Sequence, residues 1–177
     1  MTPRVKPQHY PELFQRHEQN PILTANDWPY PVHTVFNAGA CQIDDTTLLL
    51  VRAEDRRGHS HLSVARSANG VSDWRIDAQP SFAADPVNYA EEAWGVEDAR
   101  VTWIPERQEW IIAYTAFSPI GPLVSLASTV DFKSFNRLGP VMPPEDKDAA
   151  IFPRRFGDRY AMIHRPVSAG SSGAHIW

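Results

Sequence analysis

Short apolar runs rich in β-branched residues alternate with turn residues from residue 35 to residue 165. This period-two pattern predicts a protein built of β-strands. The first group of predicted strands covers 35–43, 46–52, 60–67 and 74–76. The second group covers 99–104, 110–116 and 123–129, and a third group covers 149–154 and 160–165. Turn residues such as Asp44-Asp45 and Asn69-Gly70 separate the strands.

The first two groups share one order of elements. Segment 62–67 is followed by a turn and Trp74, and segment 124–129 is followed by a turn and Phe135. The two segments lie about 60 residues apart, which indicates an internal repeat. Many short strands at regular spacing are typical of a β-propeller or a β-sandwich, and repetition of a four-strand unit favours the propeller.

The number of repeats is small for a closed propeller. Propellers close with about four to eight blades, whereas this all-β chain supplies two and the start of a third. Residues 175–177 end the chain within another apolar, strand-like run. We therefore interpret residues 1–177 as one partial propeller domain, a fragment or half of a larger assembly. An exposed strand edge favours self-association into a homo-oligomer.

The N-terminal residues have a different character. Residues 1–20 are polar and interrupted by proline, so we interpret them as an N-terminal extension. Within it, 11–19 can form one or two helical turns with Leu13 and Phe14 facing inward. Residues 28–31 must be extended, because a residue that precedes proline is pushed out of helical geometry.

Composition limits the class of protein. The 177 residues are 42% hydrophobic, enough for one well-buried domain and too few for two. The 16 prolines argue against long helices. A net charge of −4 gives no electrostatic reason to expect nucleic acid or an anionic membrane as a partner.

Cysteine usage and targeting signals indicate the compartment. The single cysteine, Cys41, excludes an internal disulfide and fits a cytoplasmic protein. Its apolar surroundings predict a small buried side chain rather than a nucleophile. No apolar run approaches the ~20 residues of a membrane helix. The N-terminus also lacks the charged-then-apolar plan of a signal peptide.

The strongest candidate for chemistry is the segment 94–100, in which Glu97 and Asp98 follow a Trp-Gly pair. Neighbouring side chains on a strand point to opposite faces, so one carboxylate can face a cleft while the other serves the fold. Glycosidic bond cleavage needs an acid kept protonated by burial beside apolar groups. The alternative is turn chemistry at Asp98 and an ion pair between Glu97 and Arg100.

Other polar residues interrupt the predicted strands. Arg52 and Asp55 flank a hairpin loop that is either a sugar-binding rim or a solvated tip, and the pattern favours the tip. Asn37 lies in a small, apolar strand, so a buried amide there is either hydrogen-bonded within the protein or faces a ligand.

Lys147 precedes one strand and Arg165 ends the next. If these strands are antiparallel, the two cations converge into a phosphate pocket; otherwise they are surface cations, or Lys147 pairs with Asp146.

Other catalytic and metal motifs are absent from the sequence. It contains no Gly-rich phosphate loop, no nucleophile elbow and no zinc-ligand spacing. His59 and His61 lie two apart and can share one face of a strand, but their position at a loop edge indicates solvated histidines. We therefore predict no metal site.

In order and spacing, several segments together resemble glycoside hydrolase family 130, the β-mannoside phosphorylases and β-1,2-mannosidases. The matching segments are 20–23, 35–40, 51–55, 64–67, 94–100, 114–116, 147–150, 152–153 and 164–166. Ala99 stands where the family commonly has proline, a change that an extended segment tolerates. The resemblance implies a five-bladed β-propeller, of which this chain covers about two and a half blades.

The resemblance also implies a reaction. Asp98 is implied as the catalytic acid, which protonates the glycosidic oxygen through the 3-hydroxyl of the bound mannose. Inorganic phosphate, the co-substrate, attacks the anomeric carbon from the opposite face and gives α-mannose 1-phosphate with inversion. Because phosphate is already an anionic nucleophile, no general base and no cofactor are needed, and cations must position it.

The remaining site residues follow from the same resemblance. Asn37, Arg52 and Asp55 are implied to bind the β-mannosyl substrate, and Lys147 and Arg165 are implied to bind phosphate. One alternative is an inverting β-1,2-mannosidase, which uses water and needs a carboxylate base. Another is a non-catalytic, carbohydrate-binding propeller fragment. The presence of both Lys147 and Arg165 favours phosphorolysis.

Overall fold

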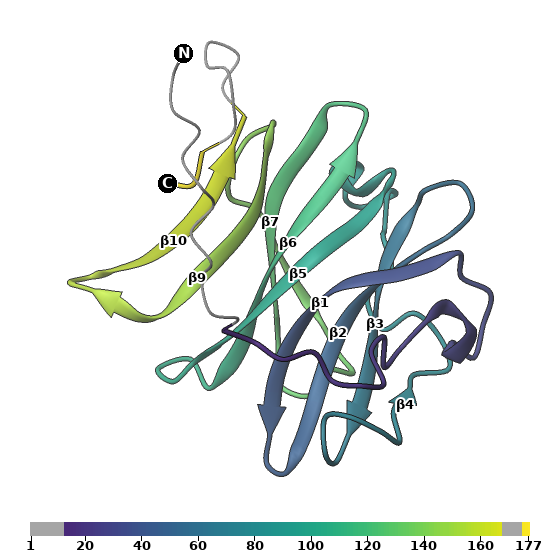
Figure 1. The fold of residues 1–177 in the computed structure, drawn as a ribbon. Helices are drawn as coiled ribbons and strands as arrows, with labels where there is room; N and C mark the ends of the chain where they lie inside the picture. Colours follow the sequence, from purple (N-terminus) through teal and green to yellow (C-terminus); the bar gives the residue numbers. More distant parts are fainter. Residues whose placement is uncertain (1–12, 168–174) are drawn as a thin grey trace, which may run out of the picture.

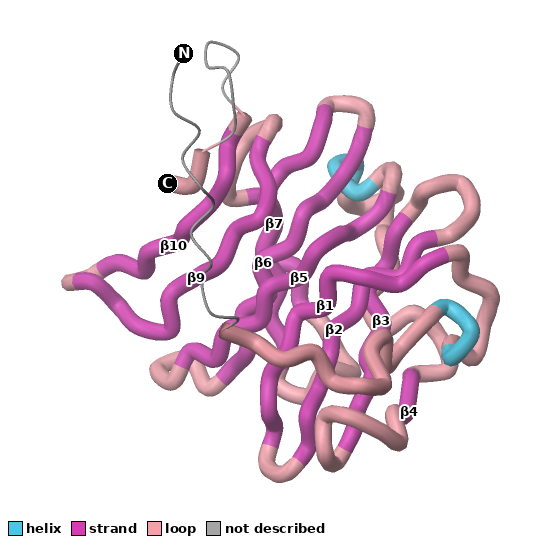
Figure 2. The backbone as a smooth tube through the Cα atoms, in the orientation of Figure 1, coloured by secondary structure: helices cyan, strands magenta, loops and turns pink. Residues whose placement is uncertain are grey.

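The computed structural model describes residues 13–167 and 175–177. Almost all of its regular structure is β-strand, which confirms the predicted all-β class (Figure 1). The strands are β1 (Thr34–Ile43), β2 (Thr46–Glu54), β3 (Ser60–Ser67), β4 (Arg75–Ile76), β5 (Gly95–Ile104), β6 (Glu109–Ser118), β7 (Gly121–Thr129), β8 (Asn136–Pro140), β9 (Asp146–Phe156) and β10 (Arg159–Pro166). Figure 2 shows the two short 3-10 helices of the described residues, η1 (Ala25–Asp27) and η2 (Ala90–Glu92).

The strands form repeated antiparallel units. The first unit runs β1-β2-β3-β4, the second runs β5-β6-β7-β8, and the third is the β9–β10 hairpin. The first two units join through one parallel pair, Ser60 of β3 with Gly95 of β5. Strands β3 and β7 occupy the same place in successive units, so the predicted repeat is confirmed. In Figure 1 the third unit lies beside the second.

The structure extends several predicted strands and adds one. Strand β5 begins at Gly95 and β9 at Asp146, several residues before the predicted starts. Five of the seven added residues are charged, and charged side chains oppose strand propensity, so the sequence pattern started both strands too late. Strand β8 was missed because it contains Gly139 and Pro140, yet it pairs with β7. The final residues, 175–177, exchange backbone hydrogen bonds between Trp177 and His164 of β10.

The predicted N-terminal helix is wrong. Residues 13–20 contain no helix, and Leu13 and Phe14 are 86% and 88% exposed. The first two residues of the predicted helix lie outside the described residues. A segment this short cannot offset the cost of helix nucleation unless its apolar side chains pack against something. Trp28, by contrast, is extended as predicted and is buried.

Apolar side chains hold the units together in shared cores. The main core takes Leu48, Leu50 and Leu62 from the first unit and Ile112 and Tyr114 from the second. Full burial of each aliphatic side chain stabilises the fold by about 1.5–3 kcal/mol. A smaller core around Ala113, Val124 and Ala149 joins the second unit to the third. The units therefore fold as one body rather than as independent hairpins.

The first strands of the three units lie against one another, with β5 between β1 and β9 (Figure 1). At Gly39 of β1, a Cβ atom would lie 2.7 Å from the carbonyl oxygen of Ala99 on β5. Between β5 and β9, the Thr102 hydroxyl donates a hydrogen bond to the carbonyl of Ile151 at 3.1 Å. These contacts bring the polar residues of three separate units to one region.

Each of these first strands carries a bulge with a polar residue in the left-handed region. The residues are Asn37 (φ 46°), Asp98 (φ 52°) and Asp148 (φ 56°). The strand register shifts at the same three places. Asn and Asp tolerate this backbone conformation better than other non-glycine residues. The repeat therefore extends to a local backbone feature that the sequence pattern did not predict.

A Gly95→Ala substitution is expected to destabilise the fold by about 2–5 kcal/mol. Gly95 has φ +125°, and a Cβ there would lie 2.5 Å from both the backbone N and O of Ser60. Urea unfolding measures the change. The matched control is Gly157→Ala, where φ is +68° and no atom lies within 4 Å, so only about 1–2 kcal/mol of backbone strain is added. Equal losses would contradict a steric role for the β3–β5 junction.

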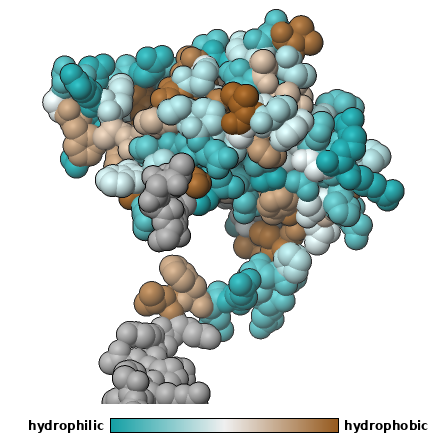
Figure 3. Space-filling view, turned by 90° about the horizontal axis from the view of Figure 1, so that it is seen from above, coloured by the Kyte–Doolittle hydropathy of each residue, from teal (hydrophilic) through white to brown (hydrophobic). Residues whose placement is uncertain are grey.

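Seen from above, the described part of the molecule shows apolar residues in small groups among polar ones (Figure 3). No helix in that part is long and apolar enough to cross a membrane.

Candidate active site

Glu97 and Asp98 are both buried, at 7% exposure each, and both contact Arg52. The strand pattern predicted that their side chains would point to opposite faces. That expectation is wrong, because the left-handed bulge at Asp98 interrupts the alternation. The alternative pairing of Glu97 with Arg100 is also absent, since Arg100 donates to the carbonyl of Ala99. The two carboxylates instead form one cluster.

Arg52 organises this cluster through its guanidinium group. Its Nε donates to the Ser60 hydroxyl at 2.8 Å. Its Nη2 donates to Glu54 at 2.8 Å and to Glu97 at 3.0 Å. Its Nη1 donates to Glu97 at 3.1 Å and to Asp98 at 3.2 Å. A guanidinium has five N–H donors, and all five therefore have acceptors within the protein.

Asp98 has one oxygen engaged and one open. Its Oδ1 accepts hydrogen bonds from Arg52 and, at 3.1 Å, from Nδ2 of Asn37. Its Oδ2 accepts none from the described residues. Asn37 is exposed rather than buried, and of the two alternatives left open for its amide, a hydrogen bond within the protein is present. This arrangement fixes the Asp98 carboxyl through Oδ1 and leaves Oδ2 without a donor from the described residues.

The electrostatics of the cluster favour protonation of Glu97. Burial raises the pKa of the Glu97 carboxyl. The positive charge of Arg52 opposes the shift, and the negative charge of Asp98 adds to it. The positive charge of Lys147, on β9, lowers the pKa of Glu97 and so also opposes the shift. The third unit thus contributes a cation to the surroundings of the Arg52 cluster.

Asp55 lies apart from this cluster and serves its own loop. Its carboxylate accepts hydrogen bonds from the backbone N–H of Arg57 and His59 and from the Arg57 side chain. Although burial opposes the shift, the bonds from Arg57 and His59 lower the pKa of Asp55 to about 2. The solvated hairpin tip favoured by the sequence pattern describes this geometry better than a sugar-binding rim does.

An Asp55→Asn substitution is expected to lower the melting temperature at neutral pH. The depressed pKa means that Asp55 stabilises the fold above its ordinary value of 3.8, and this contribution is lost as pH falls through about 2. The loss stays below about 1 kcal/mol, because the side chain is 32% exposed and its ion pair is screened. Melting curves at pH 6 and pH 1.5 measure it, with the exposed Asp45→Asn as control. A difference between Asp55→Asn and wild type that persists at low pH would contradict the assignment.

Lys147 and Arg165 lie opposite each other across the antiparallel β9–β10 hairpin, as the sequence predicted. Lys147 does not pair with Asp146, whose Oδ2 lies 2.6 Å from Nδ1 of His164. Arg165 binds Asp148 through Nε, at 2.6 Å, and through Nη2. The two cations therefore lie at paired positions on the two strands, and Arg165 also forms an ion pair with Asp148.

The residues considered for metal binding and thiol chemistry are placed differently. His61 is half-buried, with Nε2 lying 3.0 Å from the Tyr30 hydroxyl, and burial lowers its pKa. The expectation of solvated histidines is therefore wrong for His61. In residues 13–167 and 175–177, no group of three His, Cys, Asp or Glu side chains is placed to hold a metal. Cys41 is half-buried against the main core, and burial raises its thiol pKa to about 11.

Glu92 is a buried acid that the sequence pattern did not indicate. Glu92 is fully buried and accepts hydrogen bonds from the Tyr114 hydroxyl at 2.8 Å and from Nε of Arg137 at 2.9 Å. The backbone N–H of Asp85 donates to its other oxygen. Glu92 ends η2, which leads into β5 and Asp98. No local pattern marks Glu92, because its partners come from a preceding loop and from two later strands.

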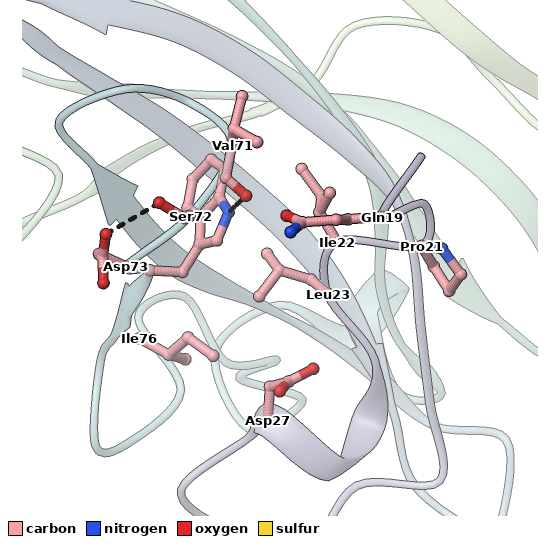
Figure 4. A pocket seen from close by; sticks show the side chains of 10 residues that line it. Gln19, Pro21, Ile22, Leu23, Asp27, Val71, Ser72, Asp73 and Ile76 are labelled. Atoms are coloured by element: carbon pink, nitrogen blue, oxygen red, sulfur yellow. Dashed lines mark hydrogen bonds between the residues drawn. The ribbon is translucent and has the colours of Figure 1, made fainter. Parts of the chain in front are cut away.

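Figure 4 shows a surface pocket of about 350 Å³, and none of its lining residues belongs to the Asp98 cluster. The N-terminal segment 19–27 and the loop before β4 form its walls. Its polar lining residues include Gln19, Asp27, Ser72 and Asp73, and among the residues that the structure describes no cation lines it. The pocket therefore does not suit phosphate and is not part of the candidate active site.

A family model described as beta-1,4-mannooligosaccharide phosphorylase, that of glycoside hydrolase family 130, matches residues 9–175. Beta-1,2-mannobiose phosphorylase from Listeria innocua is 32% identical over 67% of this chain and 32% of the relative. Beta-1,4-mannooligosaccharide phosphorylase from Ruminococcus albus is 25% identical over 93% of this chain and 50% of its own length. The chain thus spans half or less of these relatives.

Solved structures show the same fold. The beta-1,2-mannobiose phosphorylase of Listeria innocua, in complex with beta-1,2-mannobiose, superposes with a TM-score of 0.80 at 24% identity. That match covers 92% of this chain and 61% of the other. A glycosyl hydrolase from Bacteroides ovatus superposes with a TM-score of 0.74 at 20% identity, over 85% of this chain and 53% of the other. By its sequence match over 9–175, the chain belongs to glycoside hydrolase family 130.

Proposed function

We propose that this protein acts as a β-mannoside phosphorylase. It cleaves a β-mannosidic bond with inorganic phosphate, inverts the anomeric centre and releases α-mannose 1-phosphate. One observation carries the proposal. Lys147 and Arg165 are paired in register across the β9–β10 hairpin, and the charge of Lys147 lowers the pKa of Glu97 in the cluster that holds Asp98. A pair of cations, one of which acts on the cluster of the buried acid, suits an anionic nucleophile.

Asp98 is the proposed acid. Its Oδ2 is open, and its Oδ1 is fixed by Arg52 and Asn37. The proton passes from Oδ2 through the 3-hydroxyl of the mannosyl group to the glycosidic oxygen. The leaving sugar departs while a phosphate oxygen bonds to the anomeric carbon from the opposite face. Because phosphate arrives as an anion, its attack needs positioning rather than a general base.

The other proposed site residues divide into two roles. Asn37 is exposed beside Asp98 and can turn its amide to a sugar hydroxyl. Arg52 has all of its donors engaged, so it contributes to the sugar site by holding Asp98. Asp55 contributes by shaping the loop after β2. Lys147 and Arg165 receive the phosphate.

We also propose that the three units are blades of a five-bladed propeller, of which residues 1–177 supply about two and a half. Two units have four strands, and the third has two. The third unit leaves Phe152, Phe156 and Ile163 exposed, at 39%, 46% and 40%. Apolar surface of this kind suits further strands of the same blade.

We place the protein in the cytoplasm, as its single cysteine suggests.

Incubation of the chain with β-1,2- and β-1,4-linked mannosyl oligosaccharides, with and without phosphate, tests the proposal. The expected product is mannose 1-phosphate, formed only with phosphate. Release of free mannose without phosphate would replace phosphorolysis by hydrolysis, and no product of either kind would show that residues 1–177 do not form a working site on their own. A Lys147→Ala substitution is expected to raise KM for phosphate by about tenfold, the loss of one charge-assisted contact, and to leave KM for sugar unchanged. The control is Lys133→Ala, at an exposed turn between β7 and β8.

A further inference from the structure

The bulge in the first strand has an arginine partner in the first and third units, whereas in the second unit the equivalent partner is Thr115. In the first unit, the residue before Asn37 pairs in register with Arg52. In the third unit, the residue before Asp148 pairs in register with Arg165. Asp148 and Arg165 therefore occupy, in the third unit, the positions that Asn37 and Arg52 occupy in the first. The repeat places a second arginine beside a second bulged carboxylate.

The two arginines differ in how much of the guanidinium is occupied. All five N–H donors of Arg52 have protein acceptors. Arg165 gives its Nε and Nη2 to a single oxygen of Asp148, Oδ2, at 2.6 and 2.5 Å. Its Nη1 has no acceptor within residues 13–167 and 175–177. A guanidinium presents two flat edges that each match an oxyanion, and only the Nε–Nη2 edge of Arg165 is taken.

We propose that Asp148 is a positioning residue for the phosphate: it clamps one edge of Arg165 so that the Nη1–Nη2 edge faces the anion beside Lys147. The inference rests on the proposed function and deepens it by assigning the orientation of one phosphate ligand. Asp148 itself does not touch the phosphate, and it acts only through Arg165.

Stability alone does not account for the pair. The side chains of Arg165 and Asp148 are 31% and 35% exposed. Ion pairs this exposed add little to stability because solvent screens them and two long side chains must be ordered. Ordering the arginine in advance does help a ligand, because binding then no longer bears that entropy cost.

A purely electrostatic role predicts the opposite outcome. A carboxylate near a phosphate dianion repels it, so deletion of Asp148 would strengthen phosphate binding if charge dominated. Deletion weakens phosphate binding if orientation of Arg165 dominates. The sign of the change therefore separates the two roles.

The test uses Asp148→Gly and Asp148→Asn in the chain described above. Glycine and asparagine both tolerate the φ of 56° that Asp148 adopts, so neither variant strains the bulge. Isothermal titration with inorganic phosphate is expected to show about three- to tenfold weaker binding for Asp148→Gly, the cost of ordering one long side chain. Asp148→Asn keeps an oxygen acceptor and is expected to lose less. The control is Asp158→Gly, whose side chain is 90% exposed at the turn of the same hairpin.

A second readout reports on Arg165 without phosphate. In 15N NMR, its Nε–H is expected to exchange slowly with water in the wild type and in Asp158→Gly, and quickly in Asp148→Gly. Phosphate binding by Asp148→Gly that is equal to or tighter than that of the wild type would overturn the positioning role while leaving the phosphate site intact. A wild-type chain that binds no phosphate would overturn the phosphate site itself, and this inference with it.

Discussion

An Asp98→Asn substitution is expected to reduce mannose 1-phosphate formation by about 10²–10⁴-fold, the range over which a positioned general acid acts. The amide cannot supply a proton from the position of Oδ2, so the leaving sugar must depart unprotonated. Asp98 receives hydrogen bonds from Arg52 and Asn37 at Oδ1, and the amide oxygen of the variant can still accept them. The loss therefore falls on kcat. Initial rates at saturating sugar and phosphate measure it.

The fold of this variant is expected to survive. Asp98 has φ 52°, and Asn tolerates the same backbone conformation. The matched control is Asp44→Asn, an exposed residue with φ 50° at the turn between β1 and β2, which should retain wild-type rates. Melting temperatures of both variants are expected to stay close to that of the wild type. A rate for Asp98→Asn within threefold of the wild type would remove Asp98 from the mechanism.

The strand pattern could be predicted from sequence because it depends on local alternation. Strand β3 matches its predicted range, 60–67, and the hairpins between predicted strands form as expected. The repeat was visible for the same reason, since each unit repeats the order of strands, turns and aromatic residues. Strand β8 was missed, because its Gly139 and Pro140 oppose strand propensity while pairing with β7 stabilises it.

The geometry of the candidate site could be predicted only in part. The antiparallel pairing of Lys147 with Arg165 follows from two neighbouring strands, so sequence spacing was enough. The joint contact of Glu97 and Asp98 with Arg52 depends on a left-handed residue within a strand, and residue type alone does not reveal φ. The saturation of Arg52 likewise depends on acceptors from three different strands.

Breaking the buried pair of Glu92 and Arg137 is expected to have the largest effect on stability. Arg137 donates to Glu92 through Nε and Nη2, and its guanidinium lies 4.2 Å from the centre of the Phe82 ring. An Arg137→Met substitution leaves a fully buried carboxylate without its cation, which costs about 3–5 kcal/mol. That loss is a large share of the ~5–15 kcal/mol by which most domains are stable. Urea unfolding monitored by tryptophan fluorescence measures it.

The size of this loss depends on the uncompensated charge, and two further variants separate charge from packing. Arg107→Met removes an exposed partner of Glu109 and is expected to cost less than about 1 kcal/mol. The double variant Glu92→Gln with Arg137→Met removes both charges and is expected to recover about 1–4 kcal/mol relative to Arg137→Met alone. If the double variant were as unstable as Arg137→Met, the packing of Arg137 on Phe82 and Tyr89 would be its main contribution. Recovery would instead show that the unpaired charge of Glu92, at the end of η2, is what destabilises Arg137→Met.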